Sequence, residues 1–583
     1  MKNNKVIFLT TAIASLLAIT GCGKFGNGGT ANSFESEWNT EGPNKTTITV
    51  GNFGGGIGSL WIEKAADRFA KLHADTSFAE GKKGVYIKFI NSFELKTSTM
   101  DKSNTSMFFD ERFSDIQELA QAGLLLNLDE IVKDSSRQGG SLESNIFDSV
   151  KDGLQVQGSY YGLPHYEYYG GLTYNHEIFD SLYAYFAADD AEDSIEWDCK
   201  YGTENFVSTL DTKRSKGPDG VYNTEDDGLP ATMQQFIVLM DYIKSNNCAP
   251  ICISGQYQKY GDYLISGLWS ALAGAQQMKN YYNCVGEIEV VERDASGNIV
   301  YDGNAFEGID YVKKPKTKMV TMSSDGTQGY LGNDMAAKYY AIALLDIIKN
   351  EGFFNLDSGI STKSHYDAQK CLYLGDVSSE YDKAAMLIEG SYWYNESNEM
   401  GCLAQFERYT GRKKENLDVR WMSLPTEVFN SDSFVGKEQA LVDIGHSFSM
   451  INGNVKNNPE LKGVCLEFMK FLYTEEELTA FSVQTGMPRM INYPMNTNDL
   501  TQSGPFYSKL FAQRNANTDN VVGLSGTTEV FKKAKSIIKL CLQSSPFVDA
   551  AGQYCLQKIK NNEHAPKIFD DYAIKPENWK YSN

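Results

Sequence analysis

The strand, loop, helix and strand pattern of residues 47–90 constrains the fold more than any other part of the chain. Residues 47–50 are β-branched and predict a short strand, and a glycine-rich run follows from Gly51 to Gly58. Apolar residues then recur at helical spacing, at Trp61, Ala65, Phe69 and Leu72. Residues 85–90 predict the next strand. Because such a unit gives parallel strands with a right-handed crossover, the sequence predicts an α/β fold.

The glycine-rich loop between the first strand and the helix has two interpretations. Backbone N–H groups at a helix N-terminus attract phosphate, but no Gly-Lys-Ser/Thr follows the loop and its spacing does not fit a dinucleotide fingerprint. Open α/β sheets bind ligands outside the carboxyl ends of their strands. We therefore expect a ligand-binding loop here, with Phe53 as a contact.

Length and charge narrow the class of protein. The chain has 583 residues, more than one hydrophobic core usually supports, so we expect two or more lobes. Its formal net charge of -21 argues against attraction to phosphate backbones, and we expect no nucleic-acid partner.

The N-terminal segment indicates export. Lys2 and Lys5 precede an apolar run over residues 6–18 that is too short for a permanent membrane helix, which predicts a signal peptide over residues 1–21. The run ends Ile-Thr-Gly-Cys22, which resembles the lipobox of bacterial lipoproteins and implies lipidation of Cys22. An ordinary cleaved signal with an incidental cysteine is the alternative. Residues 22–46 are rich in Gly, Asn, Ser and Thr and predict a flexible tether.

The other nine cysteines lack the dense spacing of a disulfide scaffold. Cys248 and Cys252 form neither a CxxC redox motif nor half of a convincing zinc site. Cys465 and Cys541 lie in helical apolar patterns, where a small buried side chain is the expected role.

Composition changes in two central segments predict insertions. Residues 187–228 are acidic and loop-like, and residues 286–321 carry strand-forming residues around a turn at 294–298, which predicts a β-hairpin. Long helices are predicted at about residues 334–349, 459–473 and 528–543.

Four segments in order resemble the extracytoplasmic solute-binding proteins of ABC sugar importers. Phe108-Phe-Asp-Glu-Arg-Phe113 with residues 119–125 resembles a strand and helix of that family's first lobe. Tyr161-Gly-Leu-Pro164, before Tyr174-Asn175, is similar to its first crossing between lobes. Residues 383–393, Lys-Ala-Ala-Met-Leu-Ile-Glu-Gly-Ser-Tyr-Trp, resemble its binding strand and turn. Residues 459–471 with Thr485-Gly-Met-Pro-Arg489 resemble its late helix and return.

The resemblance implies a two-lobed α/β fold of the periplasmic-binding-protein type II, with a hinge between the lobes. It assigns residues 47–167 and about 445–490 to the first lobe. The second lobe takes residues 168–444 and 491–583, with the two insertions. The implied function is capture of a carbohydrate, an oligosaccharide, and its delivery to the membrane subunits of an ABC importer. We expect a monomer outside the cytoplasm, held to the membrane by its N-terminal lipid only.

Sugars need flat aromatic surfaces for their C–H faces and polar side chains for their hydroxyl groups. The resemblance places Tyr168 and Tyr392 at ligand positions. Adding the aromatic and charged residues near the same segments gives the candidate set Phe53, Asp110, Glu111, Arg112, Tyr166, Tyr168, Trp269, Glu389, Tyr392, Trp393 and Arg489. Core packing is the alternative for each aromatic residue, above all Trp269, and structural ion pairs are the alternative for both arginines. Glu389, on an otherwise apolar strand, favours a functional partner.

An acidic loop over residues 211–228 predicts a structural calcium site. It resembles the G-P-D-G-x-x-x-T-x-D-D-G loops that bind calcium in some extracellular bacterial proteins, and Ca²⁺ prefers several oxygen ligands. The candidate ligands are Asp211, Asp219, Asn223, Asp226 and Asp227. A solvated acidic turn is the alternative.

A surface-anchored carbohydrate-active hydrolase is the rival class. It would need paired catalytic carboxylates, which the sequence alone does not reveal. The six histidines form no metal-ligand motif, and neither HExxH nor G-x-S-x-G occurs. These observations favour a binding protein with no catalytic residues.

Overall fold

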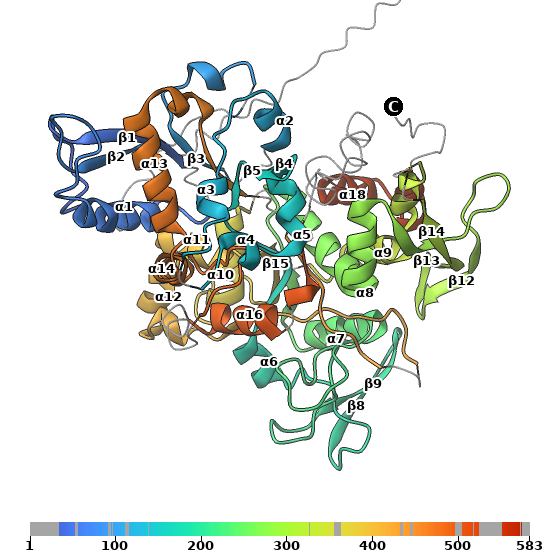
Figure 1. Cartoon of the computed structure of the whole chain (residues 1–583). Coiled ribbons are helices and arrows are strands. Elements are labelled where there is room, and N and C mark those ends of the chain that lie inside the picture. The colour runs from blue at the N-terminus through green and yellow to red at the C-terminus, as the bar shows by residue number, and fades with distance from the viewer. Residues whose placement is uncertain are drawn as a thin grey trace, which may run out of the picture.

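The structure is a computed structural model of the whole chain. It describes residues 34–52, 56–90, 95, 97–110, 116–137, 139–323, 325, 327–354, 363–431, 435–443, 447–495, 504–516, 518–523, 551–571 and 573. These residues form two mixed α/β lobes, each built around its own sheet (Figure 1).

The sheet of the first lobe has the strand order β2-β1-β3-β18-β6. Its strands are β1 (Thr46–Asn52), β2 (Val85–Ile90), β3 (Met107–Asp110), β6 (Leu163–Pro164) and β18 (Phe448–Ile451). Strand β1 pairs in parallel with both β2 and β3, which confirms the predicted opening unit. Strand β18 comes from far along the chain and runs antiparallel to β3 and β6.

Helix α1 (Leu60–Leu72) connects β1 to β2. Trp61, Ala65 and Phe69 are buried as predicted, whereas Leu72, the last helical residue, is 66% exposed. The predicted apolar pattern was wrong at Leu72, because the buried stripe of the helix ends before it.

Two late helices complete the first lobe beside α1 (Figure 1). Helix α13 (Pro459–Leu472) confirms the predicted late helix, and its N-cap Asn458 accepts hydrogen bonds from the backbone N–H groups of Glu460 and Leu461. Helix α14 (Glu475–Thr485) begins with three glutamates, which suit the positive end of the helix dipole. Short helices on the connection from β3 to the first crossing are α2 (Ile116–Gln121), α3 (Asp129–Val132), α4 (Leu142–Asn145) and α5 (Asp148–Lys151).

The sheet of the second lobe has the order β10-β15-β7-β16. Its strands are β7 (Gly170–Asn175), β10 (Ala249–Cys252), β15 (Ala384–Gly390) and β16 (Val419–Trp421). Strand β15 is buried along its whole length, which fits its run of apolar residues. The helices of this lobe include α6 (His176–Leu182), α7 (Met233–Ser245), α8 (Gly261–Asn283), α9 (Ala336–Asn350), α10 (His365–Leu374), α11 (Trp393–Glu399) and α12 (Leu403–Thr410). Helix α9 confirms the helix predicted near residues 334–349.

The chain passes between the two sheets in three places. Residues 165–169 lead from β6 to β7, and the segment after β16 leads back to β18 through β17 (Leu441–Asp443). After α14 the chain returns toward the second lobe, where α16 (Pro505–Ala516) packs on β16. Strand β17 pairs in parallel with β19 (Val521–Gly523). The two lobes are therefore connected by several separate segments of the chain, which is the architecture of a hinged protein.

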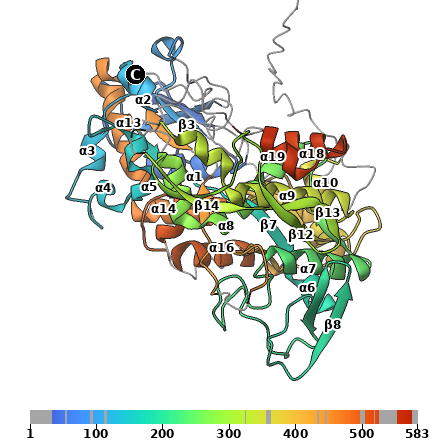
Figure 2. The same ribbon diagram turned by 90° about the vertical axis from the view of Figure 1, so that its right-hand side faces the viewer.

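The first insertion contains regular structure that the sequence did not predict. Strands β8 (Ser194–Cys199) and β9 (Gly202–Val207) form an antiparallel hairpin at the far end of the second lobe (Figures 1 and 2). The prediction of a loop was wrong there: Ile195, Trp197 and Cys199 alternate with polar residues along β8, but the acidic residues of the segment conceal this strand pattern. The rest of the segment follows the predicted irregular course.

The second insertion is more elaborate than one hairpin. Strands β12 (Tyr301–Phe306) and β13 (Ile309–Pro315) form a hairpin, while β11 (Gly286–Val291) pairs with β14 (Thr317–Met322). The predicted turn is present, since the Asp294 N–H donates to the Asn298 carbonyl oxygen. Beside this insertion, α18 (Ala551–Lys560) and α19 (Ala565–Asp571) pack on α8 and α9 (Figure 2). The helix predicted at 528–543 lies outside the described residues.

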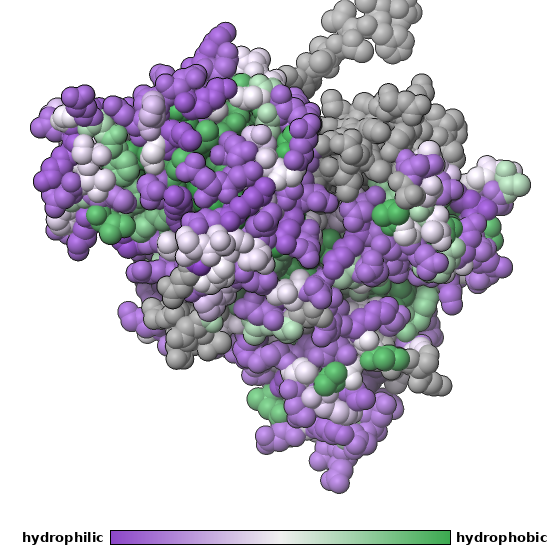
Figure 3. All heavy atoms as spheres, viewed as in Figure 1, coloured by the Kyte–Doolittle hydropathy of each residue, from purple (hydrophilic) through white to green (hydrophobic). Residues whose placement is uncertain are grey.

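The visible surface in Figure 3 is mostly hydrophilic, with small scattered apolar areas. Each of the eight cysteines in the described ranges is free, and seven of them are buried. Among these residues, no helix combines the length and the apolar character that a membrane crossing requires. Cys22 and the predicted signal peptide lie outside the described residues.

Candidate functional site

The first crossing between the sheets is fixed by a buried ion pair. Glu167 is fully buried, and its carboxylate accepts hydrogen bonds from Arg514 of α16 at 2.8 Å. The Glu167 N–H donates to the Pro488 carbonyl oxygen at 3.0 Å, and Arg514 also donates to the Arg489 carbonyl oxygen at 2.9 Å. The first two contacts join the first crossing to α16 and to the segment after α14, and the third joins these two to each other, so this region holds the lobes in register.

The next residues of the crossing bind the second lobe. The Tyr168 N–H donates to the Asp443 carboxylate at 3.2 Å, and the Tyr169 N–H donates to the Ser391 hydroxyl at 3.0 Å. In return, the Ser391 N–H donates to the Tyr169 carbonyl oxygen. The turn after β15 is thereby connected directly to the crossing by hydrogen bonds.

Three predicted aromatic residues meet at this junction. The rings of Tyr166 and Tyr168 stack with centroids 5.8 Å apart, and Tyr168 meets the edge of Tyr392 at 5.2 Å. Tyr166 and Tyr392 are buried, whereas Tyr168 is only partly buried. Gly390 makes this arrangement possible, since a Cβ there would lie 2.5 Å from the Tyr392 ring.

Glu389 lies next to these rings at the end of β15. The Tyr392 hydroxyl donates to its Oε1 at 3.5 Å, and the Gly390 N–H donates to the same oxygen at 3.2 Å. The hydroxyl groups of Tyr263 and Tyr392 are 2.9 Å apart, and the Tyr260 hydroxyl lies 3.4 Å from that of Tyr392. Four predicted residues, Tyr166, Tyr168, Glu389 and Tyr392, are thus brought together.

Burial governs the electrostatics of this cluster. It raises the pKa of Glu389 well above its ordinary value, and the neighbouring Glu396 raises it further. Burial also raises the pKa of Tyr392 and lowers the pKa of His365 to about 4, so His365 is neutral near pH 7. The cluster is therefore an aromatic environment with acidic groups and no protonated histidine.

Two predicted tryptophans lie in the core of the second lobe. Trp393 is fully buried, donates from Nε1 to the Thr173 hydroxyl at 2.9 Å and packs against Phe506. Trp269, in the middle of α8, is 1% exposed and packs against Tyr281. Both occupy packing positions in this conformation, and their contact with a ligand stays a prediction.

Arg489 is placed in the first lobe among aromatic rings. Its side chain is fully buried, with the guanidinium carbon 4.2 Å from the Phe481 ring centroid and 4.5 Å from that of Tyr473. Its three guanidinium nitrogens have no hydrogen-bond partner among the described residues. The sequence offered a structural ion pair as the alternative to ligand contact for Arg489. In the structure the guanidinium group lies over aromatic rings, where cation–π attraction stabilises it. The glycine before it, Gly486, ends α14 at φ 69°, and a Cβ there would overlap the Tyr507 ring.

Four predicted residues of the first lobe have no described side chain. Phe53, Glu111 and Arg112 lie outside the described residues. For Asp110 only the backbone is described, at the end of β3, where it pairs with Phe448. The contacts of all four with a ligand stay predictions.

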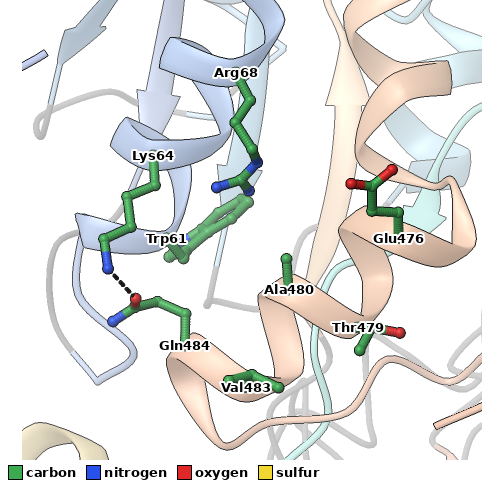
Figure 4. Close-up of a pocket in the computed structure, with 8 residues that line it drawn as sticks. All are labelled: Trp61, Lys64, Arg68, Glu476, Thr479, Ala480, Val483 and Gln484. Atoms are coloured by element: carbon green, nitrogen blue, oxygen red, sulfur yellow. Dashed lines mark hydrogen bonds between the residues drawn. The ribbon is translucent and has the colours of Figure 1, made fainter. Parts of the chain in front are cut away.

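A separate groove of about 380 Å³ lies between α1 and α14, on one side of the first lobe (Figure 4). Lys64 donates to the Gln484 side chain across it at 2.6 Å, and Trp61 lies between these two helices. Arg68 pairs with Glu477 beside it. None of the predicted ligand residues lines this groove, so it is distinct from the cluster around Tyr392.

The predicted calcium loop forms tight turns. The Asp226 carboxylate accepts from the Asp219 N–H and the Thr224 hydroxyl, and Asp227 accepts from the Asn223 N–H. Asp226 is 6% exposed, and burial raises its pKa to about 7. In the described part of the chain, no three His, Cys, Asp or Glu side chains are grouped to hold a metal ion. In this geometry the carboxylates satisfy backbone donors, and calcium binding stays a prediction.

Several residues of the cluster were not predicted from the sequence. Tyr260 and Tyr263 flank the start of α8, and their three-residue spacing beside Tyr257 was a signal that a helical pattern could have revealed. Glu167 and His365 carried no signal, since their partners lie far away in the sequence.

No protein-family model matches the chain, and no curated protein matches it in sequence. Solved structures do match over almost the whole length. A chitin oligosaccharide binding protein is 14% identical with a TM-score of 0.51, covering 92% of this chain and 99% of that one. A binding protein of an ABC transporter from Bifidobacterium animalis subsp. lactis, in complex with mannobiose, is 14% identical with a TM-score of 0.52, covering 92% and 94%. A maltose-bound protein from T. maritima is 12% identical with a TM-score of 0.50, covering 91% and 99%.

Proposed function

The chain has the two-lobed fold of the solute-binding proteins, as predicted, and we propose that it has their function as well. In this proposal it captures a carbohydrate between its lobes and delivers it to an ABC importer. The observation that carries the proposal is the meeting of Tyr166, Tyr168 and Tyr392 at the junction of the two sheets, next to the carboxylate of Glu389.

This junction has the chemistry that a sugar requires. Tyr168 is partly buried and offers a ring face and edge for the C–H groups of a pyranose. The hydroxyl groups of Tyr263 and Tyr392 and the carboxylate of Glu389 can exchange hydrogen bonds with sugar hydroxyls. A few polar groups among aromatic rings are typical of small-molecule sites.

The arrangement of the crossings suits closure on a ligand. The lobes are joined at Glu167 and Arg514, while the aromatic residues lie beside this pair on the crossing. A ligand that contacts both lobes binds the closed form better than the open form and shifts the population toward it. The closed form would then present a surface that the importer's membrane subunits recognise.

The place of action is part of the proposal. The N-terminal export signal and lipidation at Cys22 would hold a monomer on the outer face of the membrane by lipid alone. The matched chitin oligosaccharide and mannobiose proteins are binding proteins, which supports a non-enzyme over the hydrolase alternative.

A sugar panel with two readouts tests the proposal. The purified protein is incubated with oligosaccharides, and both its melting temperature and the sugar composition of the solution are followed. We expect at least one sugar to raise the melting temperature without any shorter sugar appearing. Released sugar would overturn the binding function in favour of the hydrolase, and the absence of stabilisation by every sugar would also contradict it.

A pair of matched variants locates the site. Tyr168→Ala should weaken binding of the stabilising sugar about tenfold, because about 1.5 kcal/mol of stacking is lost. Tyr409→Ala removes the same side chain from α12, where it is 49% exposed, and should leave binding unchanged. Equal affinities of both variants, measured by calorimetry, would place the site elsewhere.

A further inference from the structure

Glu389 has a buried carboxylate in which one oxygen lacks a hydrogen-bond partner among the described residues. Its side chain is 1% exposed, and two donors, the Gly390 N–H and the Tyr392 hydroxyl, bind the same oxygen, Oε1. Oε2 has no hydrogen-bond partner among the described residues. The Gln369 side chain also acts on this carboxyl group, but a buried oxygen without a donor of its own is costly, so Oε2 favours a further donor.

No described lysine or arginine forms an ion pair with Glu389. The neighbouring acid, Glu396, lies 3.7 Å from the His365 ring, which is neutral near pH 7. The strongest charge acting on Glu389 is the like charge of Glu396. The missing group is therefore better supplied by a cation than by a neutral donor, because a cation also offsets the buried charge of Glu389.

Several tyrosine side chains lie near Glu389. The ring centroids of Tyr260 and Tyr263 are 5.0 Å apart, and those of Tyr263 and Tyr392 are 6.3 Å apart. The ring of Tyr168 contacts the other side of the cluster at Tyr392. A cation within about 6 Å of such rings is attracted to their faces, and the attraction is strongest where water is excluded. A carboxylate among tyrosines is thus the environment that an organic ammonium group prefers.

We infer that the ligand carries a protonated amine, and that an amino sugar binds with its ammonium group at Oε2 of Glu389 between the rings of Tyr263 and Tyr392. This inference rests on the proposed carbohydrate-binding function and narrows its ligand class. The rings receive the C–H faces of the sugar, and the carboxylate distinguishes an amine from a hydroxyl at one ring position.

A matched set of sugars tests the inference on the unaltered protein. Glucosamine and its β-1,4 tetramer are compared with glucose and cellotetraose, which carry a hydroxyl in place of the amine, and with the N-acetylated forms, which are neutral. Galactosamine and galactose extend the set to a second sugar. Binding is measured by calorimetry at a pH that keeps the amines protonated. We expect at least one amino sugar to bind tenfold or more tightly than both of its neutral counterparts.

The substitution Glu389→Gln assigns the preference to this carboxylate. It keeps the size of the side chain and should reduce the preference for the amine to less than twofold. Glu204→Gln on β9 is the control, since Glu204 is a half-buried glutamate of the first insertion whose pKa is also raised by burial. It should leave the preference intact.

The outcomes separate this inference from the proposed function. Binding of neutral sugars as tightly as their amino counterparts would overturn the inference and leave the proposed function standing. A Glu389→Gln variant that folds and retains the preference would have the same consequence. Binding of none of the sugars, neutral or amino, would overturn both. If the Gln variant fails to fold, the comparison of amine with hydroxyl on the unaltered protein decides.

Discussion

Two buried glutamates, one on each side of the junction, have opposite surroundings. Glu167 on the first crossing is fully buried and paired with Arg514 at 2.8 Å. Glu389 at the end of β15 is equally buried, but it has tyrosine hydroxyls and a second acid beside it. The same side chain at the same depth therefore has a charged partner in one place and none among the described residues in the other.

The difference concerns how a protein with two lobes places its buried charges. A carboxylate that is paired within the protein contributes to the stability of the free protein, and the removal of its partner is felt whether or not a ligand is present. A carboxylate that lacks a charged partner destabilises the free protein and gains from a ligand. Stability and binding should consequently respond in opposite ways at the two positions.

The largest effect is expected from Arg514→Ala. This change leaves Glu167 charged and buried without a partner, and we expect the free energy of unfolding to fall by about 3–5 kcal/mol. Arg412→Ala is the control, since Arg412 pairs with Glu177 at the surface, where such pairs contribute about 1 kcal/mol or less. Denaturant titrations that give similar losses for both variants would contradict the structural role of the buried pair.

Tyr392→Phe should affect binding rather than folding. The change removes the hydroxyl that connects Tyr263 to Glu389, and we expect sugar affinity to fall about tenfold, in line with a lost hydrogen bond of about 1–1.5 kcal/mol. Tyr394→Phe removes a hydroxyl that donates to the Lys414 carbonyl oxygen away from the cluster. Calorimetry should show unchanged affinity for that second variant; an equal loss in both would argue against the cluster.

Glu389→Gln should stabilise the free protein in a pH-dependent way. Because burial raises the pKa of Glu389 in the folded state, stability is lost as pH rises above the pKa of the unfolded carboxyl, about 4.3. Glutamine does not titrate, so the variant should gain stability over the parent between pH 5 and pH 8. Unfolding curves at both pH values check this, and a constant difference would refute the titration of Glu389.

The smallest effect concerns Asp226, a third buried carboxylate. Its pKa is raised to about 7, so its charged form destabilises the loop near neutral pH unless a cation binds. If the predicted calcium site forms, calcium should raise the melting temperature by a few degrees relative to EDTA. The double variant Asp219→Asn with Asp226→Asn should abolish that difference. Equal melting temperatures of the parent protein in calcium and EDTA would exclude a calcium site in this loop.

Local patterns allowed the sequence to predict much of the fold. The opening strands, α1, α9 and α13 follow from apolar periodicity, and Gly390 and Gly486 occur where side chains approach too closely for a Cβ. The hairpin of β8 and β9 was missed because acidic residues dominate the segment, although apolar residues alternate along β8 and Phe206 and Val207 are buried on β9. A short apolar alternation among many acidic residues is therefore a weak signal for a strand.

The candidate site was predictable only in part. Tyr168, Glu389 and Tyr392 were named from motifs, but motifs could not reveal that none of the described lysines and arginines pairs with Glu389. That property depends on Tyr260, Tyr263 and Glu396, which come from different elements. The pairing of Glu167 with Arg514 spans 347 residues, and no spacing rule connects them.

If a sugar is held between the two lobes, the lobes should close on it, and the distance between them measures this directly. Dyes attached through the exposed positions Lys82 and Glu196, changed to cysteine, would report the distance between the first lobe and the hairpin of the second. We predict that a sugar which raises the melting temperature shortens this distance in a saturable manner, and that Tyr168→Ala requires about tenfold more sugar for the same change. A sugar that binds with full affinity while the distance stays constant would rule out capture by closure.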